Sequence, residues 1–351
     1  MAPNGAAQSL QIHRLPQPKY IDAVRWVPPL SAFDRFIVLA VFDSDTDEPA
    51  VEIHALNHSD SPSLSLQSSF SPPSRISALR TSQFLHKPFI AASTLAGSLH
   101  ILLADPINAS FESEVSISGK SLHDGPISDI DVQENASDCV TVGEDGRVNL
   151  VTFSNSRLNH RRIFDSNGLV SYTAAKWASP FEFATGGLGH SVQWWDHRKP
   201  GAPATQFKGS WDRGTTSGIV HSIDIHPSRK YTCLVGGSSG SVFAWDIRWS
   251  QQPVMLSGYA AGGESSFSAA SESEVWQVQY DNYSRSSSNI SNVSSSSQIL
   301  PAMICSEDGI LAVVQQGEQP IELLAEPCAI NSFDIDRQNP SVSLKQIIRL
   351  G

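Results

Sequence analysis

Two stretches that start fifty residues apart carry the same order of residue types: GGLGHSVQWWDHRKPG at 186–201 and GGSSGSVFAWDIRWSQQP at 236–253. Each begins with glycines, continues as a largely apolar run and ends in Trp-Asp-x-Arg. Glycine supplies the positive φ angles that tight hairpins need, and short apolar or alternating runs are typical of β-strands. The two stretches therefore indicate one β module that the chain uses repeatedly.

The second stretch lies inside a longer unit that predicts four strands. The residues from Ile219 to Ile225 alternate between apolar and polar, and residues 231–235 form a second apolar run. A glycine hairpin at 236–240 leads into a third strand at 241–246, and residues 253–256 can add a fourth. Four short strands separated by turn signals predict one antiparallel sheet.

Weaker copies of this unit occur along the chain, each with a turn glycine between its second and third strands. These glycines stand at 97, 146, 189, 240 and 309, in steps of 49, 43, 51 and 69 residues. Repeats of about 40–45 residues with four strands each are typical of WD-repeat β-propellers, in which stacked sheets cover one another's faces. The last step is long because it contains DNYSRSSSNISNVSSSSQ, residues 281–298, which we predict to be a disordered insert.

The ends of the chain leave closure of the ring incomplete. Only 15 residues follow AINSFDID at 329–336, whereas a full blade takes about 40. We therefore predict an all-β propeller with seven blades, the last incomplete or atypical. We predict that residues 20–336 form the propeller and that 337–351 form an atypical C-terminal tail. Residues 1–19 form an N-terminal segment that is a candidate for an outer closing strand.

Composition narrows the class of function. The 351 residues carry 24 Lys and Arg against 35 Asp and Glu, for a net charge of −11, and contain no basic run. We expect no direct nucleic acid binding, because such binding depends on neutralising phosphates with basic side chains. The chain has no apolar stretch of about 18 residues, so we expect no membrane insertion. Its four cysteines form no CxxC pair, and we expect no metal, cofactor or small-molecule substrate.

The glycine pairs at 186–187 and 236–237 do not indicate the phosphate-binding loop of an enzyme. The sequences GGLGHS and GGSSGS lead into strands, whereas a phosphate-binding loop leads into a helix and usually carries a lysine. We therefore interpret Trp195, Asp196, Trp245 and Asp246 as structural repeat residues. Asp145 and Asp308 occupy the turn position of blades that lack the Trp, and we assign them the same structural role.

An ordered series of motifs points to a family. CVTVGEDGRVNL (139–150), WDIR (245–248) followed by Pro253-Val254, SEVWQVQY (273–280) and CSEDGIL (305–311) resemble the small WD-repeat nucleoporins of the Y-shaped outer-ring subcomplex, the forty-three-kilodalton members, in a plant-type or otherwise divergent version. VRWVPP at 24–29 fits the same pattern. The residues after 336 depart from that pattern.

The resemblance implies a non-enzymatic scaffold subunit of the nuclear pore complex. Proteins of this family bind other Y-complex nucleoporins, especially an α-solenoid subunit of the short arm, and support nucleocytoplasmic transport and mRNA export. The resemblance thus places the chain in the nucleus, at the nuclear envelope.

A second hypothesis starts from two arginines. Arg198 and Arg248 end the Trp-Asp-x-Arg pattern that is similar to the box of WD-repeat substrate receptors of cullin-based ubiquitin ligases, where the arginine contacts the adaptor. The full box has an acidic residue where this chain has Gly189 and Ser239. We therefore mark Arg198 and Arg248 as candidate partner contacts and keep the ligase receptor as the alternative function.

Overall fold

The computed structural model describes ten stretches of the chain. They are 11–28, 35–57, 62–134, 138–188, 191–208, 218–248, 253–257, 270–281, 299–336 and 346–349. The described stretches contain strands and turns and no helix, so none that could cross a membrane. Most of the predicted insert, residues 282–298, lies outside the described residues, as do 337–345 of the predicted tail.

The strands follow one another in hairpins and form four-stranded antiparallel sheets. The first three sheets, blades 1 to 3, consist of β2 (Tyr20–Trp26), β3 (Phe36–Asp43), β4 (Glu48–Asn57) and β5 (Ser63–Phe70); β6 (Ile76–Phe84), β7 (Lys87–Thr94), β8 (Leu99–Ala104) and β9 (Phe111–Ile117); and β10 (Ile127–Val132), β11 (Asp138–Gly143), β12 (Arg147–Ser154) and β13 (Arg157–Asp165).

Blades 4 to 6 repeat this plan in the part of the chain that carries the opening module. Their strands are β14 (Tyr172–Ser179), β15 (Glu182–Gly187), β16 (Ser191–Asp196) and β17 (Thr205–Lys208); β18 (Val220–Ile225), β19 (Thr232–Gly237), β20 (Val242–Asp246) and β21 (Val254–Ser257); and β22 (Val275–Tyr280), β23 (Ala302–Ser306), β24 (Ile310–Val314) and β25 (Ile321–Ala325). The predicted β-propeller is thus confirmed.

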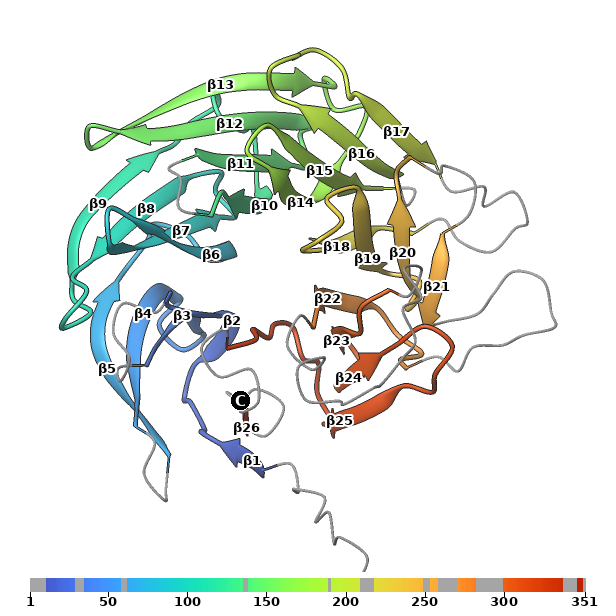
Figure 1. The fold of residues 1–351 in the computed structure, drawn as a ribbon. Helices are drawn as coiled ribbons and strands as arrows, with labels where there is room; N and C mark the ends of the chain where they lie inside the picture. The colour runs from blue at the N-terminus through green and yellow to red at the C-terminus, as the bar shows by residue number, and fades with distance from the viewer. Residues whose placement is uncertain are drawn as a thin grey trace, which may run out of the picture.

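The six blades stand around a central axis, with the first strand of each blade innermost (Figure 1). The prediction of seven blades is wrong, because the described residues form six four-stranded sheets. The remaining strands, β1 (Gln11–Arg14) and β26 (Gln346–Arg349), pair with each other in parallel and lie near blades 1 and 6 (Figure 1). The described residues 326–336, which follow β25, contain no strand, so they add no further sheet.

Strand composition follows position in the blade. The second strands are sandwiched between neighbouring blades, and every residue of β19 is buried. The outer strands face solvent on one side, so residues 157–162 of β13 alternate between exposed and partly buried. A strand that is buried on both faces has a continuous apolar sequence. A strand with one solvent-exposed face alternates between apolar and polar residues.

Neighbouring blades approach each other so closely at two strand positions that only glycine fits there. Both glycines belong to the two repeated stretches at 186–201 and 236–253. A Cβ on Gly186 would lie 2.4 Å from Val220 Cγ1 of the next blade, and one on Gly236 would lie 2.6 Å from Val278 Cγ1. The sequence suggested that residues 236–240 all belong to the hairpin, but β19 continues through Gly237. Gly240 alone of these adopts the positive φ, at 70°, that the turn requires.

The innermost strands have one edge that no strand of the same blade covers, and carboxylates of the preceding blade bond to it. Ala175 N donates to Asp129 Oδ2 at 2.9 Å, and Trp177 N donates to Asp131 Oδ2 at 2.8 Å. We call such a pair of hydrogen bonds, from alternate amides of one innermost strand to alternate side chains of the neighbouring segment, an inner-edge clamp. Because buried amides need acceptors, the clamp joins blades 3 and 4.

A second inner-edge clamp joins blades 5 and 6. Val278 N donates to Ser222 Oγ at 3.2 Å, and Tyr280 N donates to Asp224 Oδ2 at 2.8 Å. Burial raises the pKa of Asp224, although the nearby Lys176 ammonium opposes that rise. The carboxylate therefore bears a desolvation cost in order to bond the amide.

A third clamp closes the ring with residues that belong to no strand. Val24 N donates to Ser332 Oγ at 3.4 Å, and Trp26 N donates to Asp334 Oδ2 at 2.8 Å. The Trp26 indole N–H also bonds the Asp334 carbonyl at 3.3 Å. The segment AINSFDID, residues 329–336, thus joins blade 1 by the same chemistry that joins blades 3 and 4.

Ion pairs and apolar packing support the same junction. Arg35, just before β3, pairs with Asp336, and both side chains are about nine-tenths buried. Arg14 of β1 pairs with Glu326 at 2.9 Å. Phe333 and Ile335 are buried in one apolar cluster with residues of blade 6. The ring is therefore closed by ion pairs between residues far apart in the sequence, together with the apolar packing of Phe333 and Ile335.

Replacing the acceptor at the closing clamp should weaken the fold. Asp334→Ala leaves the Trp26 amide without its acceptor, which should lower the free energy of unfolding by about 1–3 kcal/mol. Urea denaturation followed by circular dichroism measures this change. Asp45→Ala, in an exposed turn, is the control and should change stability by less than about 0.5 kcal/mol. Equal effects of the two substitutions would contradict the role of the clamp.

Candidate functional site

The Trp-Asp-x-Arg residues of blade 4 form one compact unit. Trp195 is fully buried, its indole N–H donates to Thr185 Oγ1 at 2.9 Å, and its ring stacks on Phe183. Asp196 ends β16, and Arg198 returns to it with Nε and Nη2 at 2.8 and 2.7 Å. The Trp therefore lies in the core, and the Asp and Arg fix the turn that follows the strand.

Blade 5 repeats this unit. Trp245 is buried and contacts the Phe243 ring edge-on. Arg248 donates through Nε and Nη2 to the two Asp246 oxygens at 2.9 and 2.6 Å. The two modules seen in the sequence are therefore equivalent in geometry as well as in residue order.

An aromatic ring from the preceding hairpin lies under each guanidinium. The Arg198 guanidinium carbon is 4.6 Å from the centre of the Phe181 ring, and that of Arg248 is 5.2 Å from the centre of the Tyr231 ring. The residue between Asp and Arg donates its amide to the carbonyl of that aromatic residue in both blades, at 3.0 and 2.9 Å. Each arginine is thus held by a carboxylate and a ring while more than half of its side chain stays exposed.

These ion pairs perturb the titration of the carboxyls. The hydrogen bonds from Arg198 lower the pKa of Asp196 to about 2, and those from Arg248 lower the pKa of Asp246. A cation that bonds the ionised form favours that form. Both units therefore remain charged throughout the physiological pH range.

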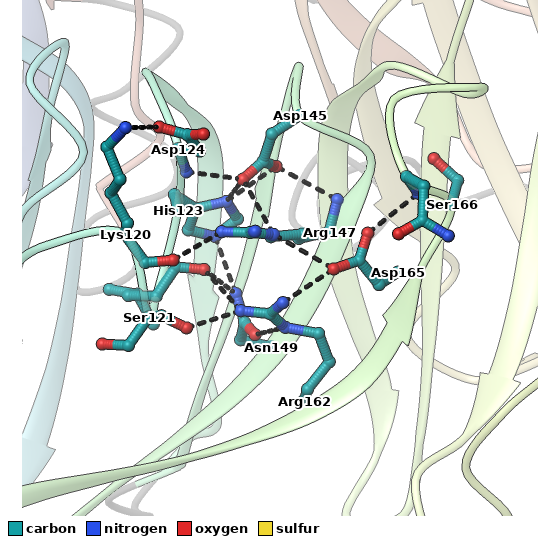
Figure 2. A network of polar contacts seen from close by, with 12 residues as sticks. Lys120, Ser121, His123, Asp124, Asp145, Arg147, Asn149, Arg162, Asp165 and Ser166 are labelled. Carbon is teal, nitrogen blue, oxygen red and sulfur yellow. Dashed lines mark hydrogen bonds and ion pairs between the residues drawn. The ribbon is translucent and has the colours of Figure 1, made fainter.

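Asp145 in blade 3 belongs to a polar network that Figure 2 shows. His123 Nδ1 lies 3.0 Å from Asp145 Oδ1, and His123 Nε2 lies 2.9 Å from Thr141 Oγ1. Burial raises the pKa of Asp145, but hydrogen bonds from His123 and from the Asp124 amide outweigh it and leave the pKa below its usual value. The carboxylate thereby ties the connection before β10 to the hairpin between β11 and β12.

Two side chains extend this network over the outer part of blade 3 (Figure 2). Arg147 donates to the Lys120 carbonyl at 2.7 Å, and Arg162 donates to Asn149 Oδ1 at 3.0 Å and to Asp165 Oδ2 at 2.7 Å. The acceptors are a main-chain carbonyl, an amide oxygen and a carboxylate of the same blade and the connection that precedes it. The arginines of this network are therefore occupied in holding the blade together.

Asp308 in blade 6 has a similar position but different donors. It accepts hydrogen bonds from Ser271 Oγ at 2.9 Å, from the Glu272 amide at 3.1 Å and from Ser306 Oγ. Ser271 thus stands where blade 3 has His123, and the bonded turn survives without a histidine.

The sequence alone did not indicate the bonds that His123 makes. The histidine stands in HDG, residues 123–125, just before β10 begins at Ile127. The sequence does not show that His123 pairs with Asp145, because Asp145 lies 22 residues further along the chain. The predicted residues therefore belong to four separate hydrogen-bonded units, one on each of blades 3 to 6.

The described residues also contain no group of three or more His, Cys, Asp or Glu side chains that could hold a metal ion. The carboxylates of the units in blades 3 to 6 all accept hydrogen bonds from neighbouring groups. Arg198 and Arg248 are thus held in fixed positions while more than half of each side chain stays exposed.

The chain has relatives among known proteins, although no family model matches it. The "Nuclear pore complex protein NUP43" of Arabidopsis thaliana is 53% identical over 345 residues, covering 95% of this chain and 93% of that protein. The human "Nucleoporin Nup43" is 27% identical over 209 residues, covering 56% of this chain and half of the human protein.

Two solved structures are similar in fold. "Structure of Dos1 propeller" has a TM-score of 0.58 over 90% of this chain and 73% of that one. "COPII on membranes, outer coat vertex" has a TM-score of 0.68 over 94% of this chain and 80% of that one. Both are 14% identical in sequence, so they show the propeller fold alone.

Removing His123 should destabilise blade 3. His123→Ala deprives Asp145 and Thr141 of a buried partner, which should lower the free energy of unfolding by about 1–3 kcal/mol. Guanidinium denaturation measures the change, and His160→Ala on the outer strand of the same blade is the control, with a smaller expected effect. If both variants match the unsubstituted protein, the network does not stabilise the blade.

Acid should weaken the Asp–Arg units in a defined direction. Because the folded pKa of Asp196 and Asp246 lies below the unfolded value of about 3.9, their contribution is present above that value and is lost as pH falls through the folded one. Asp196→Asn with Asp246→Asn should be less stable than the unsubstituted protein at pH 6, and the difference should shrink toward about pH 2. A difference that stays constant between pH 6 and about pH 2 would contradict the assignment.

Proposed function

The chain belongs to the Nup43 family of nuclear pore complex proteins, and from this premise we propose that it is a structural scaffold subunit of the outer ring of the pore. The relationship to the Arabidopsis protein, at 53% identity along nearly the whole length of both, is the observation that carries the proposal. The nuclear envelope is accordingly its location.

Within the pore, we assign it to the Y-shaped subcomplex as the partner of an α-solenoid subunit, in support of nucleocytoplasmic transport and mRNA export. The motif series at 139–150, 273–280 and 305–311 supports that assignment, because it resembles the outer-ring member of this subcomplex. The function requires binding and no catalysis.

The physical mechanism is docking of a preformed surface. Six sheets pack against one another, and the closing junction joins residues about 300 positions apart in the chain. A rigid surface loses little conformational entropy when it binds, so more of the contact energy appears as affinity. A closed ring of sheets is therefore suited to a permanent place in an assembly.

The ligase receptor remains the alternative hypothesis, since Arg198 and Arg248 are exposed enough to reach an adaptor. Their hydrogen bonds to Asp196 and Asp246 nevertheless give the Trp-Asp-x-Arg pattern a role inside the molecule. The pattern can thus be explained without an adaptor, and the nuclear pore function is the stronger proposal.

Affinity purification decides between the two proposals. The full chain, tagged and expressed in plant cells, should be recovered from nuclear envelopes together with other nuclear pore proteins, while the tag alone should recover none. Mass spectrometry identifies the co-purified chains. Recovery of the ligase adaptor in their place would overturn the scaffold assignment and support the receptor.

A further inference from the structure

The two Asp–Arg–aromatic units lie on adjacent blades and are joined into one surface. Lys230 Nζ lies 4.5 Å from the centre of the Tyr231 ring and bonds Glu182 of blade 4 at 2.8 Å. The Tyr231 ring also contacts Trp194 of blade 4, with ring centres 6.0 Å apart. We call Phe181, Arg198, Lys230, Tyr231 and Arg248 the arginine–aromatic strip.

Cations lie outermost in this strip and carboxylates lie beneath them. The side chains of Arg198, Lys230 and Arg248 are 56, 47 and 57% exposed. Their partners Asp196, Glu182 and Asp246 are 11, 18 and 25% exposed. An approaching molecule therefore meets positive charge first, on a chain whose net charge is −11.

The guanidinium groups keep donors for a partner. Asp196 and Asp246 accept from Nε and Nη2, and Nη1 of either arginine bonds nothing in the described part of the chain. Carboxylate and ring already fix each guanidinium, so a partner need not order it again. Arginine and aromatic residues are also the types that contribute most binding energy at protein interfaces.

We propose that the arginine–aromatic strip of blades 4 and 5 is a docking surface for an acidic segment of another nuclear pore protein, whose carboxylates bond Arg198 and Arg248. A carboxylate can accept charge-assisted hydrogen bonds from the Nη1 groups that Asp196 and Asp246 leave free. A nucleic acid is the weaker candidate, because its many phosphates would be repelled by the acidic remainder of the chain. This inference rests on the proposed scaffold function and specifies where that scaffold binds.

Cross-linking without a spacer tests the contact directly. A carbodiimide joins lysine amines to carboxylates that already lie within ion-pair distance. Applied to the tagged full chain in intact nuclear envelopes, it should couple Lys230 to an Asp or Glu of another pore protein. The internal link between Lys230 and Glu182 shows that the reagent reached the strip; this link without any intermolecular one would overturn the proposal.

Charge reversal provides the second test. Arg198→Glu with Arg248→Glu should reduce the recovery of co-purified pore proteins at least tenfold, and Arg198→Gln with Arg248→Gln should reduce it less. The control, Lys120→Glu with Arg157→Glu, makes the same change of net charge at exposed positions outside the strip and should leave recovery unchanged. Thermal unfolding of each variant verifies that the blades remain folded.

The outcomes separate the two proposals. If the unsubstituted chain recovers no pore proteins, the scaffold function itself fails. If it recovers them and the reversal variant recovers them equally well, the function stands and the strip is not the docking surface. The inference would also be overturned if the charge-reversal variant lost the ligase adaptor or bound RNA but still recovered the pore proteins.

Discussion

Hydrogen bonds from main-chain amides of an innermost strand to side chains of the segment beside it join blade 3 to blade 4, blade 5 to blade 6, and residues 329–336 to blade 1. An innermost strand has a neighbour on one edge only, and its other amides face the axis, where an unpaired group is costly. Asp131, Asp224 and Asp334 each accept such an amide at 2.8 Å. The clamp at Asp334 closes the ring even though residues 329–336 form no strand, so closure depends on side-chain chemistry more than on a β-ladder.

Much of the fold could be predicted because most strands pair with strands that are their neighbours in the sequence. Hairpin strands lie within a few residues of one another, and the alternation at Ile219–Ile225 identifies β18 to within one residue. The number of blades could not be predicted, because closure joins Trp26 to a carboxylate 308 positions away and leaves no periodic signal. The bond between His123 and Asp145 was missed for a related reason, since it crosses from a loop to a turn and neither lies in a regular strand pattern.

The candidate site shows the same limit. Trp195 and Arg198 were singled out from the sequence, but the ring beneath the arginine was not, because Phe181 comes from the previous hairpin and carries no motif. Only the fold brings carboxylate, guanidinium and ring together twice on neighbouring blades. The family follows from sequence identity, whereas the proposed docking surface follows from three-dimensional placement, and the rigidity of the closed ring is what makes that placement usable by a partner.

Residue-resolved amide hydrogen exchange of the unsubstituted protein tests closure most directly. The amide of Trp26, bonded to a segment outside any sheet, should exchange as slowly as those of Trp177 and Tyr280, whose acceptors lie on neighbouring strands. Exchange of the Trp26 amide at the rate of an unstructured peptide, with the other two protected, would show that the ring is open between blades 6 and 1 and would contradict the account.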